Sequence, residues 1–179
     1  MSSSRQQSGT TLLELGMVLS VSAILLTLAV PSLVEFHARS QLKGARISLF
    51  TSLQNARIHA VSYGKHVLLC PSDDGEHCAD GTEWSPGWIV FVDEDRDRER
   101  SPGEALLWRE AIEDSRQSVT TTRGRTRIRF SPLGTAPGTN LTISLCHRGI
   151  PQTSSKLVVS NAGRTRNVVD AGPDPHCNG

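Results

Sequence analysis

The sequence lacks the motifs by which enzymes of this size bind and activate their substrates. It has no P-loop, no Gly-rich dinucleotide fingerprint, no pair of metal ligands at helical spacing and no nucleophile signature around its Ser, His and Asp residues. Internal repeats with a structural period are missing as well. We therefore expect a binding or structural protein that has no catalytic activity, no cofactor and no metal.

Formal charge is almost absent from Leu12 to Val34, where Glu14 is the one charged residue. About 20 mainly apolar residues are enough to cross roughly 30 Å of hydrocarbon, so this run is long enough to span a membrane. A signal peptide would have a shorter apolar core with basic residues directly before it. A carboxylate at mid-bilayer costs on the order of 2–3 kcal/mol and needs a partner. The run offers no Lys or Arg, so we expect the partner of Glu14 to come from another chain.

In this region the chain resembles the type IV pilins and the type II secretion pseudopilins. Their signature is a short basic leader ending in Gly, a cleavage site, and a Glu at the fifth mature position. The leader here would be residues 1–9, cleaved between Gly9 and Thr10. The resemblance implies cleavage and methylation by a prepilin peptidase, and pairing of Glu14 with the terminal amine of a neighbouring subunit. Thr10 departs from the large apolar residue usual in the family, whereas Pro31 matches a frequent Pro that would kink or locally melt the helix.

After the membrane-inserting helix of 10–34, residues 35–62 are expected to continue as an amphipathic helix. Apolar residues recur there every three or four positions, and Gly64 is a plausible stop. The expected stripe is Ile47, Phe50, Leu53, Ala56 or Arg57, and Ala60 or Val61.

The remaining residues, 63–179, are expected to form a β-rich head. They contain short β-branched or aromatic stretches bounded by Gly, Pro, Ser or Asn. The fold class is therefore α+β and pilin-like: a long N-terminal helix packed on two small antiparallel sheets. The expected strands are 66–70, 87–93, 105–110, 127–132, 141–146, 156–161 and 165–171.

Four Cys in a chain that leaves the cytoplasm favour disulfides over metal or redox chemistry. Three pairings are possible, and we favour Cys70–Cys78, which closes a short polar loop, with Cys146–Cys177, which ties the C-terminus to a strand. Zinc is the competing interpretation, because His77, His147 and His176 stand next to three of the Cys, but the spacing follows no zinc pattern.

The overall charge of +1 conceals a strong asymmetry. Residues 71–114 hold 14 Asp and Glu against 4 Arg, whereas residues 115–179 hold 9 Lys and Arg against 2 Asp. Eight of these nine cations are Arg, which contacts phosphate in a bidentate manner. A basic segment of this kind indicates a polyanionic partner.

The sequence Gly-Arg-Thr-Arg occurs twice in the basic segment, at 124–127 and 163–166. Arg residues at i and i+2 share one face of a strand, and the Gly permits a turn or the close approach of a ligand. The motif alone is weak, and a solvated hairpin face is the simpler interpretation. The residues proposed to bind DNA are Gly163, Arg164 and Arg166 of the second copy, joined by Arg148 and Lys156 of the same segment and by Arg125 and Arg127 of the first copy.

The head most resembles the FimT-type minor pilins and the H-type pseudopilins, with "CPSDDGEHC", "WSPGWIVFVDEDRD", "FSPLGTAPGTNLTISLC" and "LVVSNAGRTR" carrying the resemblance. In FimT-type minor pilins of transformable bacteria, a Gly-Arg-x-Arg motif before the last Cys is associated with DNA binding. The resemblance thus implies that the chain binds DNA. The basic segment has Phe130 but no Trp or Tyr on which the bases of single strands would stack, so double-stranded DNA is the expected form.

The acidic stretch "DEDRDRERSPGE" invites a calcium interpretation. Asp93, Asp95, Asp97 and Glu104 take positions 1, 3, 5 and 12 of an EF-hand loop, but position 6 is Arg98 instead of Gly. We favour a self-neutralising hairpin loop.

Two functions follow. The first is a minor pilin that captures DNA for natural transformation, located in the inner membrane as a single-pass protein before assembly and then in a pilus at the cell surface. Its partners would be other pilin subunits, bound through the N-terminal helix, and DNA. The alternative is a structural tip or priming subunit of a pilus or a type II secretion pseudopilus, without a role in DNA binding.

Overall fold

The computed structural model describes residues 11–150, 153–169 and 171–174, which form one helix and eight strands. The proposed cleavage site at Gly9 and Thr10, and Cys177 of the second proposed disulfide, lie outside these residues. The chain divides into two compact units, Met1–His37 and Ala38–Gly179.

The helix α1 runs from Leu12 to Tyr63, without a break at Pro31. It is long and apolar enough to cross a membrane, and its apolar window is entirely exposed. The Thr11 hydroxyl caps the first turn by accepting a hydrogen bond from the Glu14 amide at 3.2 Å. Hydroxyl groups within the apolar part donate to carbonyl oxygens of their own helix, for example Ser20 to Gly16 at 2.8 Å. These hydroxyl groups are therefore satisfied within the helix, as a bilayer requires.

The helix ends where Gly64 was expected to stop it. Gly64 has a φ of +62°, and the Lys65 amide donates to the Ala60 carbonyl at 3.2 Å. This pairing across a left-handed Gly is a Schellman motif, which satisfies a carbonyl at the end of the helix.

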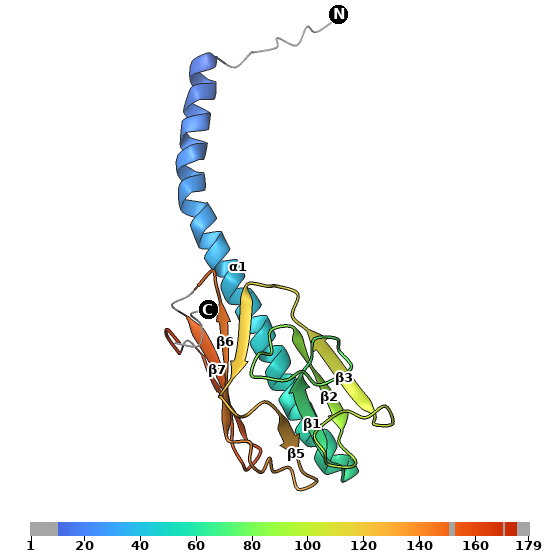
Figure 1. Cartoon of the computed structure of the whole chain (residues 1–179). Helices are drawn as coiled ribbons and strands as arrows, with labels where there is room; N and C mark the ends of the chain where they lie inside the picture. Colours follow the sequence, from blue (N-terminus) through green and yellow to red (C-terminus); the bar gives the residue numbers. More distant parts are fainter. Residues whose placement is uncertain (1–10, 151–152, 170, 175–179) are drawn as a thin grey trace, which may run out of the picture. The chain divides into compact units, whose positions relative to one another are not determined.

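Two antiparallel four-stranded sheets form the head, as the α+β interpretation expected (Figure 1). The first sheet has the order β3-β2-β1-β5, and the second has the order β4-β6-β7-β8. The strands are β1 Val67–Pro71, β2 Gly87–Val92, β3 Leu106–Ala111, β4 Gln117–Thr121, β5 Ile128–Phe130, β6 Leu141–His147, β7 Ser154–Val159 and β8 Thr165–Val168.

The part of α1 that belongs to the head lies between the two sheets (Figure 1). Its buried apolar side chains join those of both sheets in one core. The predicted stripe was wrong for Ile47, which is 50% exposed, and of the alternatives Ala60 and Val61 it is Ala60 that is buried. The apolar residues that are buried are Ala38, Leu42, Leu49, Leu53, Ala56 and Ala60.

The aromatic core was expected from the sequence, but its polar anchor was not. Trp84 and Trp88 are buried, and Trp108 packs against the same core. The indole N–H groups of Trp88 and Trp108 both donate to the hydroxyl of Ser52 on α1, at 3.0 and 3.3 Å. One buried hydroxyl therefore satisfies two indoles and fixes the first sheet against the helix.

One strand was missed. β4 has the sequence "QSVTT", in which Val119 is the one apolar residue, so it lacks the alternation of apolar and polar residues that identifies a half-buried strand. It pairs along its whole length with β6. Pairing with this neighbouring strand, and not the composition of β4 itself, therefore makes it a strand.

Candidate functional site

The second Gly-Arg-Thr-Arg copy forms the turn between β7 and β8. The Ser160 amide donates to the Arg164 carbonyl at 3.0 Å, and the Gly163 amide donates to the Ser160 carbonyl at 2.8 Å. Gly163 has a φ of +72°, a left-handed conformation that favours Gly over every other residue. The tight turn expected from this Gly is therefore present.

Gly163 is buried within the head. A Cβ atom at this position would collide with the carbonyl oxygen of Gly134, in the loop between β5 and β6. That same oxygen accepts a hydrogen bond of 2.8 Å from Nε of Arg57 on α1. The close approach that the Gly permits is therefore made to the chain's own backbone, which corrects the expectation that Gly163 contacts DNA directly.

Arg164 and Arg166 are exposed and have no side-chain partner among the described residues. Arg166 lies on β8 opposite Val158 of β7, and Arg164 precedes the strand by one residue. Because they are two residues apart along extended chain, they share the face of the second sheet that points away from α1. This is the same face that carries Val158.

Lys156 lies on that face too, but it is already engaged. Its Nζ is 2.9 Å from Oδ2 of Asp174, whose side chain is 1% exposed. The Ser144 hydroxyl donates to the same oxygen at 2.9 Å. The charge of Lys156 is therefore used within the head to neutralise a buried carboxylate, which corrects its proposed role in DNA binding.

Arg148 is exposed but lies between β6 and β7, at the opposite end of the sheet from the β7–β8 turn. A strand of six residues such as β7 spans about 20 Å. Arg148 therefore does not form one compact patch with Arg164 and Arg166.

The first Gly-Arg-Thr-Arg copy lies in the loop before β5, and its two Arg side chains have separate internal partners. The Arg125 guanidinium donates to the Gly138 carbonyl. Arg127, whose side chain is 15% exposed, pairs with Glu99 at 2.5 Å and with Asp80 at 3.5 Å. The first copy therefore ties the basic segment to the acidic segment instead of extending the surface of the second copy.

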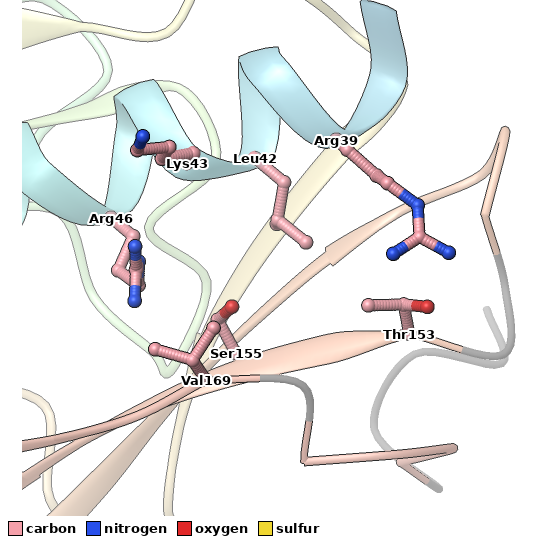
Figure 2. A pocket seen from close by; sticks show the side chains of 7 residues that line it. All are labelled: Arg39, Leu42, Lys43, Arg46, Thr153, Ser155 and Val169. Carbon is pink, nitrogen blue, oxygen red and sulfur yellow. The ribbon is translucent and has the colours of Figure 1, made fainter. Parts of the chain in front are cut away.

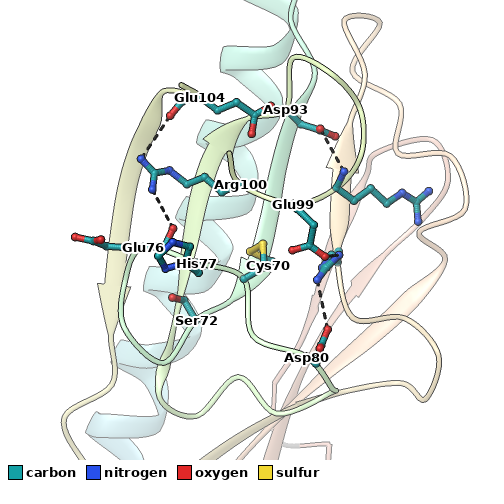
Figure 3. The surroundings of a disulfide bond; sticks show 12 residues. Cys70, Ser72, Glu76, His77, Asp80, Asp93, Glu99, Arg100 and Glu104 are labelled. Atoms are coloured by element: carbon teal, nitrogen blue, oxygen red, sulfur yellow. Dashed lines mark hydrogen bonds and ion pairs between the residues drawn. A yellow bond between two sulfur atoms is a disulfide. The ribbon is translucent and has the colours of Figure 1, made fainter. Parts of the chain in front are cut away.

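The acidic segment is organised around a disulfide between Cys70 and Cys78, whose Cα atoms are 5.5 Å apart (Figure 3). Within the closed loop, the carboxylate of Asp74 accepts hydrogen bonds from the amides of Glu76 and His77 at 2.7 and 2.8 Å, and from the His77 ring at 2.8 Å. These bonds hold the pKa of Asp74 well below its usual range. Arg100 joins this loop to the next one by donating to the Glu76 carbonyl at 3.0 Å.

The hairpin loop after β2 brings carboxylate oxygens of Asp93, Asp95 and Asp97 within 4.8 Å of one another. Glu104, the fourth candidate calcium ligand, instead accepts hydrogen bonds from the amides of Glu94 and Ser101 at 2.7 and 3.0 Å. The buried Asp93 side chain is paired with Arg129 at 3.4 Å. These contacts favour a loop that neutralises its own charge.

His147, which the sequence suggested only as a zinc ligand, is buried and anchors the start of the head helix. Nδ1 of His147 accepts a hydrogen bond from the Gly149 amide at 2.9 Å, and Nε2 lies 3.1 Å from Oε1 of Gln41 on α1. Asp114 is 3.4 Å from the same ring nitrogen, and hydrogen bonds from Arg116 hold the pKa of Asp114 well below its usual range. The sequence offered no sign of this contact, because Gln41 and His147 are 106 positions apart.

Comparison with known proteins gives consistent results. Residues 47–163 match the family described as type II transport protein GspH. The chain is 32% identical over 164 residues to the pilin-like protein PilA1 of Thermus thermophilus, covering 90% of this chain and 91% of that protein. The family match ends at Gly163, so Arg164 and Arg166 lie just beyond it.

Solved structures agree on the fold. The minor pilin FimU of Pseudomonas aeruginosa superposes with a TM-score of 0.59 at 22% identity, covering 78% of this chain and 97% of FimU. The minor pseudopilin EpsH from the type 2 secretion system of Vibrio cholerae has a TM-score of 0.52 at 11% identity, covering 73% of this chain and 98% of EpsH. The chain therefore belongs to the GspH family: it is a structural minor pilin or pseudopilin of a type IV pilus or a type II secretion system, and not an enzyme.

Proposed function

We propose that this protein is a minor pilin of a type IV pilus and that it binds double-stranded DNA through Arg164 and Arg166 for uptake in natural transformation. The observation that carries the proposal is the pair of exposed guanidinium groups at the β7–β8 turn, neither of which has a partner among the described residues. Four other proposed DNA contacts do not support it: Lys156, Arg125 and Arg127 have internal partners, and Gly163 is buried.

Two Arg on one face of extended chain suit the DNA backbone, because each planar guanidinium can take a phosphate oxygen pair. Such contacts carry no sequence information. Two phosphate contacts give a slope of about −2 for log affinity against log salt concentration, and a single subunit binds weakly at physiological salt. Several subunits in one filament raise the effective affinity by multivalency.

Assembly completes the proposal. Cleavage between Gly9 and Thr10 by a prepilin peptidase would leave Glu14 at the fifth mature position, where it pairs with the terminal amine of a neighbouring subunit. The protein would sit in the inner membrane through the apolar part of α1 before assembly, and then in the filament at the cell surface. Glu14 is exposed in the single chain, as a residue that pairs with another subunit has to be.

The alternative is a tip or priming subunit that does not bind DNA. It is favoured by the acidic segment, whose carboxylates could receive a neighbour's Arg164 and Arg166. In this case the two Arg are buried between subunits once the filament forms.

The test is a titration of the full-length protein in a neutral detergent with duplexes of unrelated sequence at two salt concentrations. The variant is Arg164→Ala/Arg166→Ala, and the matched control is Arg148→Ala, an exposed Arg at the opposite end of the same sheet. We expect the wild type and the control to bind all duplexes with the same salt dependence, and the double variant to lose at least tenfold in affinity. Equal binding by the double variant, or none by the wild type at low salt, would refute DNA capture. Loss of filaments in cells that carry the double variant would then support the structural alternative.

A further inference from the structure

A basic pocket lies between the first turns of α1 in the head and the start of β7 (Figure 2). Its volume is about 200 Å³. The cations Arg39, Lys43 and Arg46 come from α1, and hydroxyl groups come from the facing strand. The lining is completed by Leu42, Thr153, Ser155 and Val169.

Arg46 is the anchor of this pocket. It is 8% exposed, and its Nη1 donates to Oδ1 of Asn167 on β8 at 3.1 Å. Its Nε is buried with no acceptor, and no carboxylate pairs with Arg46 among the described residues. A buried guanidinium normally has an anionic partner, because a neutral amide offsets little of the cost of removing the charge from water.

The other groups around Arg46 suit an anion as well. Lys43 is exposed and has no partner in the described part of the chain. The side chains of Thr153 and Ser155 face Arg39 and Arg46 across the pocket in Figure 2 and bring hydroxyl donors. Leu42 and Val169 add apolar walls beside the cations. Cations, hydroxyls and apolar surface together match a phosphate that carries an apolar ester better than a bare inorganic ion.

We propose that this pocket binds the phosphate headgroup of an anionic phospholipid. Arg39, Lys43 and Arg46 follow Val34, the end of the apolar run, by five, nine and twelve residues. At a rise of about 1.5 Å per residue, the three cations follow the apolar run by roughly 8, 14 and 18 Å along the helix, and helical side chains point back toward the N-terminus. Arg39 and Lys43 are therefore the cations nearest the lipid phosphates, and Arg46 would hold a headgroup that is drawn into the pocket. Long basic side chains next to a membrane-spanning segment commonly contact them.

The pocket is distinct from the surface formed by Arg164 and Arg166. Val169 lies beyond the end of β8, whereas Arg164 precedes its start. The two residues are five positions apart, which is about 17 Å of extended chain. Asn167 faces α1, as its bond to Arg46 shows, whereas Arg166 is on the opposite face of the strand.

The test uses the full-length protein in a zwitterionic detergent, titrated with short-chain phosphatidylglycerol or phosphatidylcholine. Bound lipid is counted by native mass spectrometry. The variants are Lys43→Gln/Arg46→Gln and, because Arg46 is buried and its loss can disturb folding, the single exposed change Lys43→Glu. The matched control is Arg164→Gln/Arg166→Gln, which also removes two cations from the head.

We expect the wild type and the control to retain phosphatidylglycerol at least tenfold more strongly than phosphatidylcholine. Lys43→Glu and the double variant should lose that preference, and Lys43→Glu should unfold at the wild-type temperature. Displacement of the lipid by millimolar inorganic phosphate would support recognition of the phosphate group itself. Equal retention of the two lipids, an unchanged preference in a folded Lys43→Glu variant, or displacement by duplex DNA but not by inorganic phosphate would overturn the proposal.

Discussion

Gly163 and Gly134 meet backbone to backbone, although they are 29 positions apart in the sequence: the turn between β7 and β8 lies on the carbonyl of the loop between β5 and β6. Arg57 of α1 donates to the same carbonyl at 2.8 Å. A helix and two loops therefore converge at this point, which fixes the base of the turn that presents Arg164. The Gly of the motif thus acts by positioning the Arg residues that follow it.

The first prediction compares the two Gly of the repeated motif. Gly163→Ala should destabilise the head by about 3 kcal/mol or more, since it adds a collision with Gly134 to the strain of a left-handed Ala. Gly124 has nearly the same φ, +75°, but nothing within 4 Å of an added Cβ, so Gly124→Ala should cost only about 1 kcal/mol. Calorimetric unfolding of both variants measures the difference, and equal losses would show that the contact with Gly134 contributes nothing.

The second prediction concerns Lys156 and the buried Asp174. Lys156→Met should cost about 2 kcal/mol, because it leaves a carboxylate that is 1% exposed without its cation. Lys156→Met/Asp174→Asn should recover most of that stability, since the amide can still accept a hydrogen bond from Ser144. Denaturant unfolding of the two variants and the wild type checks this. The DNA affinity of Lys156→Met should equal that of the wild type. A tenfold loss of affinity in this variant would show that Lys156 contacts DNA.

The third prediction separates the two motif copies. Arg127→Ala should destabilise the head by about 1 kcal/mol through loss of its pairs with Glu99 and Asp80, which are half or more exposed. In a double-mutant cycle, Arg127→Ala should destabilise the head less when Glu99 has already been changed to Ala, because one of the two ion pairs is then absent. DNA binding should stay at the wild-type level, because Arg127 is held within the head. Weakened binding in a folded Arg127→Ala variant would contradict the assignment of DNA contact to the second copy alone.

Local patterns in the sequence predicted much of this fold. The long helix, its stop at Gly64 and seven of the eight strands each carry a local signal in apolar spacing or Gly placement. β4 carries only a weak signal, because Val119 is its one apolar residue and pairing with β6 determines it. The phase of the helix stripe was misjudged at Ile47 because a β-branched residue on a helix gives no sign of which face meets a sheet.

The candidate site was predicted less well, for a physical reason. The sequence shows which residues are cations but not which cations are already paired. Lys156, Arg127 and Arg164 look alike in a basic segment, and only the positions of Asp174 and Glu99 distinguish them. The pocket around Arg46 was missed because its cations on α1 are distant in sequence from the hydroxyls on β7.

The last prediction is a pH dependence that arises at His66, directly before β1. Burial of the ring and the neighbouring Arg96 and Arg129 lower the pKa of His66 below its ordinary value of 6.5, although Asp93 acts in the opposite direction. The unfolded chain therefore takes up this proton more readily than the folded chain. The contribution of His66 to the free energy of unfolding should therefore be constant above about pH 6.5. It should fall as the pH drops through that value toward the lower pKa of the folded state.

His66→Gln removes the group, so the unfolding temperature of this variant should fall less between pH 7.5 and pH 5.5 than that of the wild type. Arg96→Gln removes one of the two cations that oppose protonation and should give an intermediate fall. Scanning calorimetry of the three proteins at both pH values makes the comparison. The measurements stay above pH 4, because Asp74 and Asp114 have lowered pKa values. Their contribution to stability is lost below that pH and would obscure the effect of His66. If His66→Gln loses as much stability as the wild type, the pH dependence arises elsewhere in the head.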